Sequence, residues 1–199
     1  MDALIHSILA FSYAGLFLIV FAETGLLLGL ILPGDSLLIV AGILAASSGA
    51  GHLKLAGVMG AVVAGALLGS IVGYLIGRRF GPQVFRRERS RFFRPEYLTQ
   101  AQHFFERYGA LAVIAARFVP FVRTIVPTLA GVSSMSRRAF GMHSLIGAVL
   151  WGAGLPALAY LLGQRVPHLD RYVLLIVGVV LALSLVPVVL KVMQARRPA

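Results

Sequence analysis

The sequence predicts an all-α integral membrane protein. Of its 199 residues, 59% are hydrophobic and only 13% are charged, and the mean hydropathy is +0.90. A soluble domain of this length carries about 25% charged residues. The apolar residues form five long blocks, and two of these blocks contain charged side chains near prolines and glycines. The chain has no cysteine, so neither a disulfide nor a thiolate metal site is predicted, and no cofactor is expected.

The first apolar block runs from about residue 4 to 46. It is interrupted by Glu23 and by Pro33-Gly34-Asp35. We expect residues 22–48 to form a re-entrant helical hairpin, with Pro33 and Gly34 at its break. The N-terminal sequence lacks a basic region and a clear cleavage site, so we expect it to be retained. The pattern does not decide whether residues 1–20 span the bilayer or lie at its surface.

The second block, 53–76, is long enough at about 20 residues to cross the bilayer. Glycine, alanine and serine recur along it, which favours close packing of helices rather than a ligand site.

A strongly basic segment follows at 78–107, with eight arginines against three glutamates. Such a cluster is typical of a cytoplasmic loop of a membrane protein, and its attraction to anionic lipid head groups is a modest addition. We therefore expect no nucleic-acid partner. Aromatic and charged residues alternate over 91–109, which predicts a basic amphipathic helix at the membrane surface within about 81–107.

The third block, 110–132, contains Arg117, Arg123 and the hairpin-breaking candidates Pro120, Pro127 and Gly131. The fourth block (140–162) and the fifth (172–192) are predicted membrane spans, the last forming a C-terminal helix at about 170–193. Lys/Arg counting places 78–107 and the C-terminus in the cytoplasm, with 13 basic residues inside and three outside. This requires 110–132 to enter and leave on one face, as a second re-entrant hairpin.

The two halves of the chain resemble each other. Glu23 precedes Pro33 by ten positions, as Arg117 precedes Pro127. We therefore predict one domain over 1–199, built as an inverted repeat with halves at about 4–80 and 108–165. Secondary transporters with this architecture bind their substrates between the broken helices at the midplane.

The four charges within the apolar blocks are the candidate site. Each costs about 2.5–3.5 kcal/mol at bilayer depth, so such residues usually mark a transport path. Arg117 and Arg123 could converge on a lipid phosphate, which guanidinium groups grip bidentately. Glu23 and Asp35 could exchange protons. Two alternatives stay open: the arginines pair with these carboxylates to hold the hairpins together, or Asp35 caps a helix.

Enzymatic function is not expected, and no catalytic residue is predicted. Ser136-Arg137 followed by His143 matches part of a lipid-phosphatase signature, but Gly147 stands where that signature needs an aspartate. The five histidines show no spacing that suggests a metal site.

The charged segments, together with a glycine-tyrosine motif, resemble the bacterial DedA membrane proteins, which share the SNARE-associated or VTT domain. The matching motifs are Glu23…Pro33-Gly34-Asp35-Ser36, Gly73-Tyr74-x-x-Gly77-Arg78-x-x-Gly81 and Arg117-Phe118-x-Pro120-x-x-Arg123-x-x-x-Pro127-x-x-Ala130-Gly131. The resemblance covers about residues 10–190. Two departures are Leu28, where many members have proline, and Ser70, where many have aspartate, so we assign Ser70 no role.

This resemblance implies a lipid translocase of the bacterial inner membrane that depends on the proton motive force. Its first candidate substrate is undecaprenyl phosphate, held by Arg117 and Arg123, with Glu23 and Asp35 coupling protons. Flipping or scrambling of a phospholipid such as phosphatidylethanolamine is an alternative, as is proton-coupled transport of small ions or cationic drugs. A scaffold with purely structural charges is a further alternative. The oligomeric state is left open, with a homo-oligomer among the options.

Overall fold

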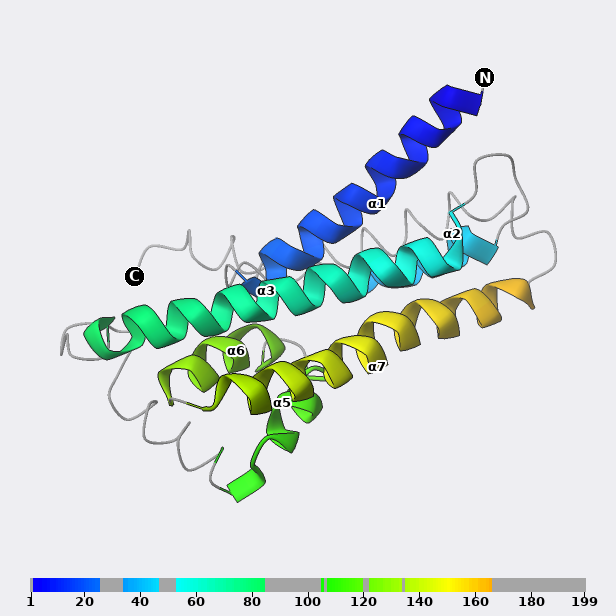
Figure 1. The fold of residues 1–199 in the computed structure, drawn as a ribbon. Helices are drawn as coiled ribbons and strands as arrows, with labels where there is room; N and C mark the ends of the chain where they lie inside the picture. The colour runs from blue at the N-terminus through cyan, green and yellow to red at the C-terminus, as the bar shows by residue number, and fades with distance from the viewer. Residues whose placement is uncertain are drawn as a thin grey trace, which may run out of the picture.

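A computed structural model of the chain describes residues 2–25, 34–46, 53–84, 105, 107–119, 122–133 and 135–165 (Figure 1). Every regular element within these ranges is an α-helix. The helices are α1 (Asp2–Gly25), α2 (Gly34–Ala46), α3 (Leu55–Val84), α5 (Leu111–Ala116), α6 (Val122–Val132) and α7 (Arg137–Gln164). The predicted all-α class is therefore confirmed for the described part of the chain.

Two of these helices are long and apolar enough to cross a membrane: the stretch Leu55–Phe80 of α3 and the whole of α7. They run antiparallel through the centre of the molecule (Figure 1) and touch where Gly152 lies against Val62 and Val63. Helix α3 continues beyond the predicted end at residue 76 as far as Val84. Residues 81–84 thus belong to α3 rather than to a separate amphipathic segment.

The N-terminal residues form one continuous helix, α1, which reaches past Glu23 instead of breaking there. Helix α1 runs in the same direction as the first part of α3. Glycines of α3 allow the backbone of α1 to approach closely. A Cβ atom on Gly65 would lie 2.6 Å from the carbonyl oxygen of Phe17, and one on Gly69 would lie 2.8 Å from that of Phe21. The small-residue pattern of this span therefore serves close packing, as the sequence predicted.

The shorter helices α2 and α6 each pack along one of the long helices. Helix α2 lies on α7, where Gly42 meets the backbone of Pro156. Helix α6 lies on α3, where Gly131 meets the backbone of Tyr74. Each contact relies on a glycine, because a Cβ atom at either position would collide with the neighbouring main chain.

Two buried apolar clusters result. One joins α1, α2, α3 and α7, and includes Val20, Leu38, Val62 and Trp151. The other joins α3, α5, α6 and α7, and includes residues such as Tyr74, Val126 and Phe140. The rings of Tyr74 and Phe140 stack at 4.5 Å between centroids. The pair α1 and α2 and the pair α5 and α6 therefore each have their own apolar core. Both cores are formed with the long helices α3 and α7.

The predicted hairpin breaks are only partly right. Gly34 is the first residue of α2, as expected of a break, whereas Pro127 and Gly131 lie inside α6. Both of those predictions were wrong. A proline removes one backbone hydrogen bond, and membrane helices accommodate that loss where neighbouring helices supply partners, so Pro127 does not end α6. Pro33 and Pro120 lie outside the described residues.

The described helices carry many exposed apolar side chains. On α7 these include Met142, Leu145, Ile146, Val149, Leu161 and Leu162, and α3 adds Leu68, Ile71 and Leu75. Such surfaces are typical of helices whose solvent is lipid. The predicted C-terminal helix at 170–193 and most of the amphipathic segment at 81–107 lie outside the described residues.

Candidate functional site

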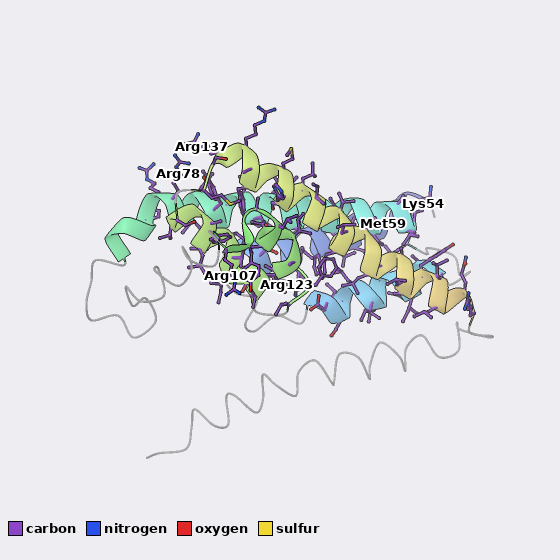
Figure 2. All side chains as sticks on the ribbon, turned by 90° about the horizontal axis from the view of Figure 1, so that it is seen from below. Lys54, Met59, Arg78, Arg107, Arg123 and Arg137 are labelled. Atoms are coloured by element: carbon purple, nitrogen blue, oxygen red, sulfur yellow. The ribbon has the colours of Figure 1, made fainter. Side chains whose placement is uncertain are left out.

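Arg123 joins the two halves of the chain. It lies in the first turn of α6, and its Nη2 and Nη1 form ion pairs with Oε1 of Glu23 on α1 and Oδ1 of Asp35 in the first turn of α2. Arg123 is 8% exposed and Glu23 is 1% exposed. Figure 2 places Arg123 well away from Lys54 at one end of the helices and from Arg78 and Arg137 at the other. Three of the four predicted charges therefore meet at one place, where Arg123 and Glu23 are buried and Asp35 is partly exposed.

Trp151 covers the flat face of the Arg123 guanidinium. The central carbon of that guanidinium lies 4.6 Å from the centroid of the Trp151 ring, within the range of a cation–π interaction. Trp151 belongs to α7 and is 3% exposed. Sequence analysis missed this residue, although it is the only tryptophan in the chain. In the sequence, a lone aromatic residue in an apolar span cannot be distinguished from any other residue of the hydrophobic core.

Arg117 has a different environment. It follows α5 directly and is 5% exposed. Its Nη2 donates hydrogen bonds to Ser70 Oγ at 2.6 Å, to Ser144 Oγ at 3.2 Å and to the carbonyl oxygen of Ala66 at 3.2 Å. All of these partners are neutral, and no carboxylate in the described part of the chain forms an ion pair with Arg117. The alternative that both arginines pair with the acids therefore holds for Arg123 alone.

Ser70 and Ser144 were also missed. Both serines are fully buried within the long helices α3 and α7. Ser70 also donates to the carbonyl oxygen of Ala66 at 2.8 Å, as serines in helices commonly do. The sequence shows them only as small residues in a span, so only the three-dimensional fold reveals that they hold Arg117.

One oxygen of the Glu23 carboxylate has no hydrogen-bond partner among the described residues. Oε2 is buried, and no hydrogen-bonding group in the described ranges reaches it. It lies directly against Gly34, where a Cβ atom would collide with the carboxylate. Gly34 therefore makes room for Glu23 as well as starting α2.

A cavity of about 380 Å³ opens beside these charges. Asp35, Arg117 and Arg123 supply its polar part. Its apolar wall comes mainly from α7 and consists of Leu150, Trp151, Gly154, Leu155 and Leu158, with Phe118 added from the turn after α5. Arg117 and Arg123 thus line one space that has both a charged and an apolar part.

His143, the histidine of the partial phosphatase match, lies on α7. The imidazole Nδ1 of His143 lies 2.8 Å from the carbonyl oxygen of Ala139, one turn earlier in the same helix. Within the ranges that the structure covers, no three His, Asp or Glu residues group as metal ligands do.

Comparison with known proteins identifies the family. Residues 32–161 match the VTT domain. The chain is 44% identical over 188 residues to an uncharacterized membrane protein of Mycobacterium tuberculosis, covering 93% of this chain and 82% of the relative. It is 41% identical to protein DedA of Escherichia coli, covering 94% and 84%, and 34% identical to the inner membrane protein YqjA of the same species, covering 79% and 70%. No solved structure matches the chain significantly. The chain is therefore a membrane protein that belongs to the DedA family, defined by the VTT domain.

Proposed function

We propose that this protein is a lipid translocase of the bacterial inner membrane that moves a phosphate-headed lipid between leaflets. The observation that carries the proposal is a cavity that is lined by both Arg117 and Arg123 and by an apolar wall. Guanidinium groups bind phosphate oxygens through paired hydrogen bonds, and the apolar wall suits a hydrocarbon chain. Undecaprenyl phosphate is the first candidate substrate.

We propose that residues 22–48 and 110–132 form re-entrant hairpins related as an inverted repeat. The close contacts between elements support this architecture. Helix α1 packs on α3 while α2 packs on α7, and correspondingly α5 packs on α7, through Gly147 and Ile114, while α6 packs on α3. Each hairpin would then reach the midplane from its own side, which brings their charged residues together as in other transporters.

The proposed orientation places 78–107 and the C-terminus in the cytoplasm. In its support, Arg78 and Arg137 lie at one end of the long helices and Lys54 at the other (Figure 2). Positive charges concentrate on the cytoplasmic side of membrane proteins.

Glu23 and Asp35 would couple translocation to protons. Because both acids hold Arg123, adding a proton to either one weakens its ion pair with that arginine. Proton uptake on one side and release on the other could in this way bias the direction of lipid movement. The proposed translocation involves no covalent step, so we propose a transport protein rather than an enzyme.

The test is translocation in proteoliposomes. Purified protein is reconstituted with a labelled polyprenyl phosphate, and its appearance in the opposite leaflet is followed with and without a proton gradient. We expect Arg117→Ala and Arg123→Ala to lower the rate at least about tenfold, because each removes a charge-assisted phosphate contact worth about 1.5–3 kcal/mol. Arg138→Ala is the matched control, since that arginine is exposed on α7.

Unchanged flipping in both arginine variants would refute the proposed site. Parallel assays separate the alternatives. Movement of a labelled phosphatidylethanolamine in preference to the polyprenyl phosphate would indicate a phospholipid flippase or scramblase. Uptake of small ions or a cationic dye would indicate a proton-coupled transporter of soluble substrates. Release of inorganic phosphate that is lost in His143→Ala would indicate a phosphatase.

A further inference from the structure

The two carboxylates that pair with Arg123 are not equivalent. The side chain of Asp35 is 36% exposed, whereas that of Glu23 is 2% exposed. Asp35 belongs to the cavity lining, and Glu23 is not among the described residues that line it. A molecule in the cavity can therefore reach Asp35 directly but meets Glu23 only through Arg123.

The donors of Arg123 are divided between these two acids. Nη2 points to Glu23 behind the guanidinium, Nη1 points to Asp35 at the cavity, and the ring of Trp151 covers the flat face. A phosphate group that enters the cavity therefore finds Nη1, the nitrogen on the Asp35 side of Arg123, already bound to an anion. Arg117 differs, because its described partners are neutral oxygen atoms. A phosphate that binds Arg117 therefore does not compete with an anion among these partners.

The two acids also differ in their freedom to move away. Glu23 lies against Gly34 with its second oxygen buried, so the packing confines its carboxylate. Asp35 lies in the first turn of α2 and borders open space, so a rotation of its side chain takes the carboxylate away from Arg123.

We propose that Asp35 is a built-in competitor for the lipid phosphate at Arg123, while Glu23 stays paired with that arginine when the phosphate binds. This inference rests on the proposed function. In the empty site, Asp35 occupies Nη1. When a lipid phosphate arrives, Arg117 binds it first, and a phosphate oxygen then replaces the Asp35 carboxylate at Nη1. Glu23 keeps its ion pair throughout and holds the guanidinium in place.

The chain offers a matched pair of variants for a test, since Asp35→Asn and Glu23→Gln each remove one negative charge next to the same guanidinium. Long-range electrostatics therefore favours an incoming anion similarly in both. Only Asp35→Asn removes the anion that is bound to Nη1. Trp151 is the only tryptophan of the chain and contacts Arg123, so its fluorescence reports on this site without a label.

The experiment titrates dodecyl phosphate into the purified full chain in neutral detergent and follows Trp151 fluorescence. We expect the apparent Kd to fall about tenfold in Asp35→Asn, which equals about 1.4 kcal/mol. In Glu23→Gln we expect a Kd equal to or higher than that of the wild-type protein, because Arg123 loses its fixed counter-ion. Inorganic phosphate, titrated in parallel, should bind more weakly than dodecyl phosphate to all three proteins.

Equal Kd values in the three proteins, or an equal gain in both variants, would overturn the competitor role while leaving the proposed function in place. Weaker binding to Asp35→Asn would overturn it as well. If dodecyl phosphate changed the fluorescence of no protein, the proposed function itself would fall. Should Asp35→Asn fail to fold, Asp35→Ser provides the same comparison with a neutral side chain too short to reach the guanidinium.

Discussion

Ser70 accepts a hydrogen bond from Nη2 of Arg117 at 2.6 Å, linking two positions 47 residues apart in the sequence. Ser144 accepts a second bond from the same nitrogen. The Arg117 guanidinium is buried among hydroxyl and carbonyl groups, and no carboxylate of the described residues forms an ion pair that would balance its charge. Such a charge is costly inside a membrane protein, so we interpret Arg117 as a ligand for an anion rather than as a structural residue.

The first prediction concerns Arg117→Met. We expect this variant to fold with an unchanged or higher midpoint of thermal unfolding, because methionine removes a buried, unbalanced charge while filling similar space. Ser70 keeps its own hydrogen bond to Ala66, so few polar atoms lose their partners. Binding of dodecyl phosphate, followed by Trp151 fluorescence, should weaken at least about tenfold, the equivalent of one charged hydrogen bond.

Arg138→Met is the control for the loss of an arginine as such, since Arg138 is exposed. It should bind dodecyl phosphate as the wild-type protein does. A large loss of stability in Arg117→Met with binding retained would assign Arg117 to the scaffold instead.

Arg123 is expected to behave in the opposite way in a stability measurement. Arg123→Gln leaves Glu23 and Asp35 next to each other without a cation, and breaking a buried ion pair in this way costs about 3–5 kcal/mol. We therefore predict a clear drop in the thermal midpoint, measured in detergent. The double variant Glu23→Gln/Arg123→Gln should regain part of this loss, because it removes the buried negative charge that Arg123→Gln leaves behind.

A double variant no more stable than Arg123→Gln would show that Glu23 is not held as an ion-pair partner. Together, the two arginine experiments separate the binding role of Arg117 from the combined binding and structural role of Arg123.

The sequence could predict the membrane class and the four charged residues, because apolar length and charge in an apolar block are local signals. Which arginine pairs with which acid could not be predicted. That pairing depends on how α1, α2 and α6 meet, and Arg123 lies 100 positions from Glu23. The contact between Trp151 and Arg123 could not be predicted for the same reason, because it depends on how α6 and α7 meet.

The hairpin breaks illustrate a second limit. Proline and glycine are read from sequence as helix breakers, and Gly34 does lie at a helix start. Pro127 and Gly131, in contrast, lie within α6 where it packs on α3, Gly131 against the main chain of Tyr74. A glycine that permits a helix break and a glycine that permits close packing look the same in the sequence. The two roles can be distinguished only when the position of the neighbouring helix is known.

Gly34 leads to the third prediction. A methyl group at this position would collide with the Glu23 carboxylate, so Gly34→Ala should displace Glu23 from Arg123. Overpacking of this kind costs about 1–3 kcal/mol. We expect a lower thermal midpoint together with a changed Trp151 emission, because the ring stacks on the guanidinium that Glu23 holds.

Gly60→Ala provides the matched control on α3. A Cβ atom there has no neighbour within 4 Å, and alanine is favoured over glycine in helices by up to about 1 kcal/mol. Gly60→Ala should therefore be neutral or stabilising. If Gly34→Ala were equally harmless, the contact between Gly34 and Glu23 would have no energetic importance.

The last prediction tests the cavity itself through Gly154. This glycine of α7 lines the cavity, and a Cβ atom on it would meet nothing within 4 Å. Gly154→Leu should therefore leave the fold intact while its side chain extends into the space proposed for the lipid. We expect the translocation rate and the affinity for dodecyl phosphate to fall several-fold at an unchanged thermal midpoint. Gly141→Leu, also on α7 with open space around its Cβ position but outside the cavity lining, is the control. Equal activity in the two leucine variants would mean that the lipid takes another path, because a blocked cavity cannot accommodate its chain.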